Sequence, residues 1–152
     1  MREPAVCAPA SGRRARLAAA VPVVALLWAG LVLGVSFLAT PVKFQAPSLS
    51  LAVGLDVGRH TFAASHQVQL LLAAILLGAA ALARAPRGAL VLFATAAVVL
   101  LAQHLALLPV LDARAQIWID GGTPDGPSPH VAYVALEALK VLLLIAASLR
   151  RT

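Results

Sequence analysis

Cysteine is almost missing from this sequence. Cys7 is the only cysteine among 152 residues, so the chain cannot form an intramolecular disulfide or a C-x-x-C redox pair. This excludes the quinone-linked disulfide-forming class of membrane bundles. The sequence also has no H-x-x-x-H spacing, no Met-rich stretch and no carboxylate cluster with metal-ligand spacing. We therefore predict no cofactor or metal, and the absence of a specific catalytic motif favours a protein that is not an enzyme.

Charged residues are also scarce. They make up 12% of the chain and hydrophobic residues 61%, whereas a soluble domain has about 25% and about 45–50%. The apolar residues fall into four long blocks, which is typical of a membrane bundle. The net charge of +6 comes from basic residues at the ends of these blocks. This placement indicates membrane topology and contact with lipid, and it argues against a nucleic-acid partner.

The four blocks predict an all-α fold, a four-helix transmembrane bundle with up-down-up-down topology. Each block is long enough to cross a hydrocarbon layer of ~30 Å at ~1.5 Å per residue. The predicted spans are 17–39, 62–83, 88–110 and 129–149 within one domain, 17–149. We expect a disordered basic tail over 1–16, a short tail at 150–152, and a short interfacial helix in the first loop, capped by Ser48 or Ser50.

The distribution of Lys and Arg predicts the orientation. Eight of these residues lie in the two tails and the 84–87 turn, against three in the other two loops. Both termini are therefore expected in the cytoplasm of a bacterium, with the chain crossing its inner membrane several times. The first and third loops should face outward.

Two charges interrupt the fourth span, "YVALEALKVLLL". A charge at this depth costs at least ~2.5–3.5 kcal/mol, so Glu137 and Lys140 must face protein, water or each other. They are three residues apart and share one helical face with Tyr133. Two interpretations stay open: a dry structural pair, or a wet functional site.

Other polar residues fall at a similar depth in the neighbouring spans. The third span carries Gln103 and His104 near its outer end, and the second carries His66 and Gln69 in its outer third. Helical rise places His104 close to Glu137, while the inner halves of the spans are nearly free of polar residues. This pattern predicts a polar pocket near the outer face, with these candidate binding residues: Asp56, Arg59, His66, Gln69, Gln103, His104, Tyr133, Glu137 and Lys140.

Gly30 and Gly34 form a G-x-x-x-G pair in the first span. Such pairs let helix backbones approach closely, either within one chain or between two copies.

The stretch "WAGLVLGVSFLATPVKF" (28–44) resembles the first span and loop of an uncharacterised family of small four-helix membrane proteins, found in bacteria and with distant eukaryotic relatives. The likeness rests on Trp28-x-Gly30, Phe37, Pro41-x-x-Phe44 and, further on, Phe62, and it covers the first half of the chain. It implies a four-helix bundle and no established activity.

Three functions fit the sequence. The favoured one is a binding or scaffold protein, whose partners would be the bilayer and either a second copy or another membrane protein. An oligomeric proton-linked transporter is the first alternative, with Glu137 exchanging the proton and His104 as its relay. A haem or metal protein ligated by His66 and His104 is the second.

Overall fold

Four long helices form the molecule. The computed structural model describes residues 10–150, and within that range it contains helices and turns but no strand. The first long helix consists of α1 (Ala10–Val32), the π-helical segment η1 (Leu33–Ala39) and α2 (Thr40–Lys43). The second is α3 (Leu51–Ala83). The third consists of α4 (Arg87–Ala102), the π-helical segment η2 (Gln103–Leu107) and α5 (Leu108–Ile119), and the fourth is α6 (His130–Ser148).

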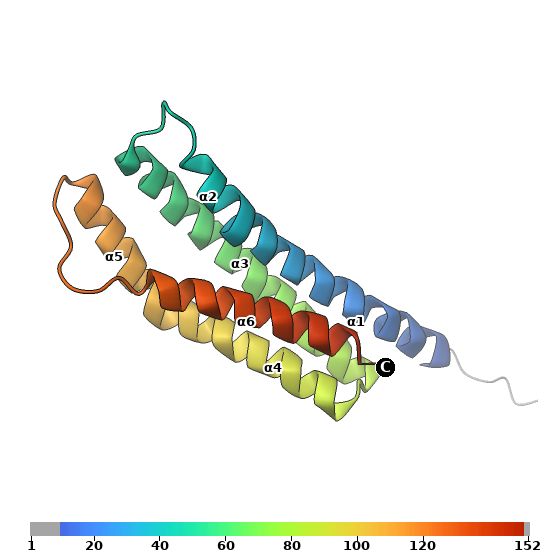
Figure 1. Cartoon of the computed structure of the whole chain (residues 1–152). Helices are drawn as coiled ribbons and strands as arrows, with labels where there is room; N and C mark the ends of the chain where they lie inside the picture. Colours follow the sequence, from blue (N-terminus) through green and yellow to red (C-terminus); the bar gives the residue numbers. More distant parts are fainter. Residues whose placement is uncertain (1–9, 151–152) are drawn as a thin grey trace, which may run out of the picture.

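The helices alternate in direction and close into a bundle (Figure 1). α1 packs against α3 and α6, and α4 packs against the same two helices from the other side. All four long helices are long and apolar enough to cross a membrane. The all-α four-helix transmembrane bundle expected from the sequence is therefore confirmed, and the chain is a multi-pass membrane protein.

The two ends of the bundle differ. At one end, here called the arginine end, Arg14 donates from Nε to the carbonyl of Ala83 at 3.0 Å, and Arg150 lies against Gly88. Here Arg84 ends α3 in the left-handed conformation (φ 57°), which makes the tight turn into α4. At the other end, here called the open end, α2, the start of α3 and α5 extend past the start of α6 (Figure 1).

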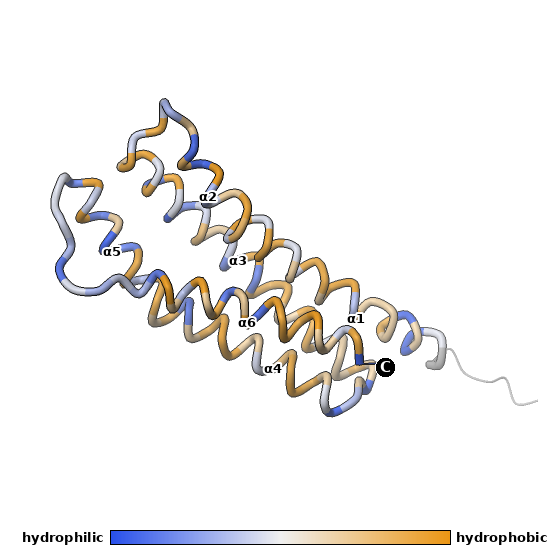
Figure 2. The backbone as a smooth tube through the Cα atoms, in the orientation of Figure 1, coloured by the Kyte–Doolittle hydropathy of each residue, from blue (hydrophilic) through white to orange (hydrophobic). Residues whose placement is uncertain are grey.

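Small residues let the four helices approach one another between these ends. The core combines many alanines with a few large side chains, among them Trp28, Leu76, Phe93 and Leu144, all fully buried. Large apolar side chains such as Leu27, Val91 and Leu142 point outward and are more than half exposed. Figure 2 shows hydrophobic residues along the helix shafts and hydrophilic residues mainly at the two ends. An outward apolar surface of this kind suits lipid contact.

The helices differ from the predicted spans at their ends. Residues 10–16, expected in a disordered tail, belong to α1, and the rest of that tail and residues 151–152 lie outside the described residues. The predicted separate interfacial helix in the first loop is wrong: residues 51–61 are the first turns of α3, capped by Ser50, whose Oγ accepts from the Val53 amide. No helix-breaking residue separates this stretch from the second span, so the helix continues.

The third long helix bends at the open end. The π-helical turn η2 is followed by Pro109 in the first turn of α5, and α5 turns away from the line of α4 (Figure 1). α5 packs back against α3. The chain beyond the predicted third span therefore forms an arm that leans over the open end of the bundle.

Candidate functional site

Glu137 and Lys140 form an ion pair in the interior of the bundle. Lys140 Nζ lies 2.8 Å from Glu137 Oε1, and both side chains are completely buried. Gln103 donates from Nε2 to the same carboxylate oxygen at 3.0 Å, and Ser36 donates to the other oxygen at 3.2 Å. Lys140 also donates to Gln69 Oε1 at 2.7 Å. The pair thus faces protein on every side, and its three further partners come from the other three long helices.

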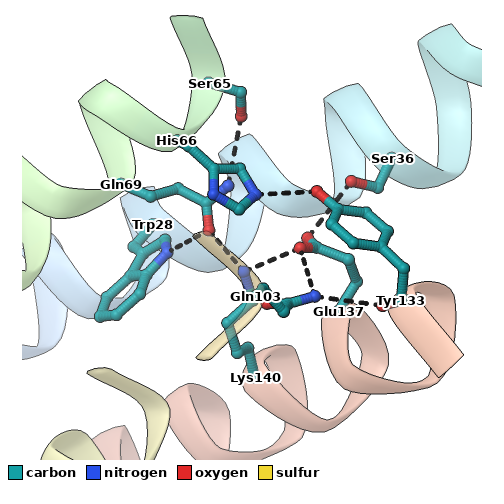
Figure 3. A network of polar contacts seen from close by, with 9 residues as sticks. All are labelled: Trp28, Ser36, Ser65, His66, Gln69, Gln103, Tyr133, Glu137 and Lys140. Carbon is teal, nitrogen blue, oxygen red and sulfur yellow. Dashed lines mark hydrogen bonds and ion pairs between the residues drawn. The ribbon is translucent and has the colours of Figure 1, made fainter. Parts of the chain in front are cut away.

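Gln69 joins the ion pair to the first helix. Its Oε1 accepts from Trp28 Nε1 at 3.0 Å as well as from Lys140, and its Nε2 donates to Ser65 at 3.3 Å. These side chains and their neighbours are here called the buried polar cluster (Figure 3), which consists of Trp28, Ser36, Ser65, His66, Gln69, Gln103, Tyr133, Glu137 and Lys140. Every long helix contributes at least one member, so the cluster cross-links the whole bundle.

The cluster lies near the middle of the long helices. Along α3 at ~1.5 Å per residue, Gln69 is about 21 Å from Ala83 at the arginine end, and along the third helix Gln103 is about 24 Å from Arg87. The two π-helical segments lie at this level as well: η1 supplies Ser36 and η2 supplies Gln103 and His104. A π-helical turn rotates the side chains that follow it and is frequently found at functional sites.

Complete burial of Glu137 and Lys140 is costly in free energy. Two charges withdrawn from water cost several kcal/mol each, and only their mutual attraction and further hydrogen bonds offset that cost. Here the carboxylate has three donors and the ammonium has two acceptors. The pair is joined to the other three long helices through Ser36, Gln69 and Gln103, so sliding of one helix past α6 would remove a hydrogen bond from a buried charge.

Three aromatic rings stack beside the cluster. His66 Nε2 lies 2.9 Å from the Tyr133 hydroxyl, and the two rings lie 6.0 Å apart at 21°. On its other side His66 stacks on His104, with ring centroids 5.6 Å apart. The sequence placed His104 beside Glu137, whereas its neighbour Gln103 occupies that position and His104 contacts His66 instead. Adjacent residues on a helix point about 100° apart, so depth alone could not choose between them.

Three buried polar atoms in this region have no hydrogen-bond partner within the described residues. They are His66 Nδ1, Gln103 Oε1 and His104 Nδ1. Each such atom costs about 1–3 kcal/mol when no partner reaches it. They lie where η2 meets α3 and α6, just below a cavity at the open end.

That cavity has a volume of about 510 Å³ and opens between α2, α3, α5 and the start of α6. Tyr133 and His104 line its inner part, and Lys43, Arg59 and Asp112 line its outer part. Most of the remaining wall is apolar, formed by these side chains among others: Phe44, Leu55, Phe62, Leu108 and Leu111. The cavity is thus less polar than the sequence predicted, because five of the expected pocket residues are buried beneath it: His66, Gln69, Gln103, Glu137 and Lys140.

Arg59 and Asp56 have different places at the open end. Arg59 forms an ion pair with Asp112 of α5 at 3.0 Å and a hydrogen bond with Gln116, so it ties the arm to α3. Asp56 is exposed and lies near His60 on its own helix, at 3.6 Å from the ring. The prediction that Asp56 belongs to the pocket is therefore wrong. Its neighbour Leu55 lines the cavity, and the next residue on a helix points about 100° away.

The predicted packing role of Gly30 and Gly34 within the chain is also wrong. A side chain at either position would meet nothing within 4 Å, and Gly30 is exposed. The close glycine contacts occur on α3 instead. A Cβ on Gly54 would lie 2.5 Å from the Phe44 ring, and one on Gly58 would lie 2.6 Å from Lys43 Nζ.

Several site residues were not identified from the sequence. Trp28 was not among the pocket candidates, although a buried indole N–H usually finds an acceptor. Lys43 and Asp112 were not among the pocket candidates, and only the fold of the first loop and the arm brings them to the cavity. Among residues 10–150, no group of three or more His, Cys, Asp or Glu side chains is arranged to hold a metal ion.

The chain matches no family model, no curated protein and no solved structure, so the resemblance of residues 28–44 stays a prediction.

Proposed function

We propose that this chain is a ligand-binding protein of the bacterial inner membrane, which holds a small molecule in the cavity at its open end. The observation that carries the proposal is the cavity itself. Its volume of about 510 Å³ and its largely apolar wall with a few convergent polar groups are the usual features of a small-molecule site. The buried polar cluster beneath it has the supporting role of keeping the four helices, and so the cavity, in one shape.

The proposed orientation places the open end outside the cytoplasm. Arg14, Arg84, Arg87 and Arg150 all lie at the other end of the bundle, and basic residues near span ends favour the cytoplasmic side. The cavity then opens toward the periplasmic face.

The geometry supports binding better than proton-linked transport. A proton-exchanging Glu137 needs water on one side at a time, whereas Glu137 and Lys140 are fully enclosed. A second cavity of about 120 Å³ near the arginine end is lined by Val21 and Phe93, among others, and includes no member of the cluster. Replacing Glu137 with Gln should therefore leave the pH dependence of solute flux across a liposome membrane unchanged, provided that the variant folds.

Filling the cavity tests the binding function. Ala115 on α5 lines the cavity, whereas Ala113 on the same helix is exposed and does not. Purified wild-type protein should carry a co-purifying small molecule detectable by native mass spectrometry. Ala115→Phe should lose this molecule, because its ring takes up the space, and Ala113→Phe should retain it. Equal occupancy in both variants, or an empty wild-type protein after mild extraction, would contradict the proposal.

A further inference from the structure

The cavity has one cation without an acidic partner. Arg59 is engaged by Asp112 and Gln116, but in the part of the chain that the structure describes, no carboxylate lies within ion-pair distance of Lys43. The Lys43 ammonium is half-buried and lies 4.9 Å from the centre of the Phe44 ring. The charged wall of the cavity is therefore net positive, and its excess charge is at Lys43.

Two glycines of α3 make room for Lys43 and its neighbour Phe44. Gly54 leaves room for the Phe44 ring, and Gly58 leaves room for Lys43 Nζ, since a Cβ at either place would come within 2.5 or 2.6 Å. This contact seats the Lys43–Phe44 pair against α3 at the edge of the cavity. The ammonium thus lies against α3 at the edge of the cavity.

Lys43 also lies at the depth of a phosphate layer. From Arg14 to Lys43 the first helix rises about 44 Å at ~1.5 Å per residue, which matches the ~40–45 Å thickness of a bilayer with its headgroups. If Arg14 lies in one headgroup layer, Lys43 lies in the other. Tyr133 and His104, at the inner part of the cavity, then lie at the depth of acyl chains.

Resting on the proposed function, we infer that the ligand is an acidic lipid of the surrounding membrane, with its anionic headgroup on Lys43 and an acyl chain along the apolar wall. Three observations point to this chemistry: an unpaired ammonium at headgroup depth, an apolar wall that includes Phe62 and Leu108 at chain depth, and a cavity that joins the two. A basic site between membrane helices is a known means of selecting acidic headgroups.

The experiment compares lipids that differ only in headgroup charge. The protein in phosphatidylcholine nanodiscs is titrated with phosphatidylglycerol, and bound lipid is counted by native mass spectrometry. We expect about a tenfold preference for phosphatidylglycerol, equivalent to about 1.4 kcal/mol. Lys43→Met should reduce this preference to less than about twofold. Lys43→Arg should retain it, which would show that the preference depends on the positive charge at this position.

The outcomes separate the inference from the proposed function. If wild type binds both lipids equally while Ala115→Phe abolishes binding, the cavity binds a ligand but the acidic lipid is wrong. If Lys43→Met keeps the preference, the headgroup does not lie on Lys43, and the inference is overturned at that residue. If decanoate added in detergent binds and phosphatidylglycerol does not, the ligand is a soluble fatty-acid anion, and the lipid assignment is overturned. If Ala115→Phe and Ala113→Phe bind lipid as wild type does, the proposed function itself fails.

Discussion

At the scale of single residues, the cost of burying charge was the most reliable guide. That cost predicted that Glu137 and Lys140 face protein, water or each other and not lipid, and both are completely enclosed. The same reasoning brought Gln69 and Gln103 to them. It could not decide that Gln103, and not His104, binds the carboxylate, because the rotation of the third helix depends on the π-helical turn at 103–107. A sequence gives depth along a helix more readily than it gives direction around it.

The ion pair leads to a residue-scale prediction about stability. Lys140→Met or Glu137→Gln alone should lower the free energy of unfolding by about 3–5 kcal/mol, because each leaves the opposite charge of the pair buried without its partner. The double variant should recover part of this loss, with a coupling energy of about 1–3 kcal/mol. Unfolding in mixed micelles measures these values. Leu139→Met is the control, since Leu139 lies on the same helix and points outward, and additive losses in the double variant would show that the pair is not a unit.

At the scale of elements, the sequence identified the four helices but not their lengths. The apolar blocks gave the portions inside the hydrocarbon layer, because that is where hydropathy changes sharply. Residues 51–61 are semi-polar, so they were assigned to a separate helix, although α3 runs through them without a break. The arm α5 follows from η2 and Pro109, and its contact with α3 depends on Arg59 and Asp112. Pairings between polar loop segments have no hydropathy signal, which is why they could not be predicted.

The contact between α2 and α3 should be sensitive to added bulk. Gly54→Leu should lower the free energy of unfolding by about 1–3 kcal/mol, because the new side chain would overlap the Phe44 ring. Gly30→Leu is the matched control: nothing lies within 4 Å of a Cβ there, and a better helix former replaces glycine, so stability should be unchanged or up to about 1 kcal/mol higher. A larger loss from Gly30→Leu than from Gly54→Leu would mean that the first helix packs differently.

The attachment of the arm can be loosened separately. Arg59→Gln should raise hydrogen exchange across 108–119 by about fivefold, which corresponds to a partly exposed ion pair worth up to ~1 kcal/mol. Exchange in α4 should not change, because the bundle below the arm keeps its contacts. Asp56→Asn serves as the control, since Asp56 contacts only its own helix through His60. Equal exchange in both variants would show that Arg59 does not hold the arm.

At the scale of the whole molecule, the two ends have separate roles. The arginine end is closed by a tight turn between α3 and α4, while the open end is extended and hollow. The sequence anticipated this one-sidedness, because the in-membrane polar residues all fell in the outer halves of the spans. It did not anticipate that the polar residues would be dry and that the cavity above them would be largely apolar. The buried ion pair and the cavity are two layers, one above the other.

Accessibility along the molecule gives the last prediction. With Cys7 replaced by Ser, single cysteines are placed at Asp125 in the exposed loop, Ala115 in the cavity, Val141 in the core and Arg87 at the arginine end. A membrane-impermeant maleimide added to intact cells should label Asp125→Cys and Ala115→Cys, because both face the outside. Arg87→Cys should react only after the membrane is permeabilised, and Val141→Cys in neither case, since the buried polar cluster admits no water to the core below it. Labelling of Arg87→Cys in intact cells would reverse the proposed orientation, and labelling of Val141→Cys from outside would show that the core beneath the cluster is wet.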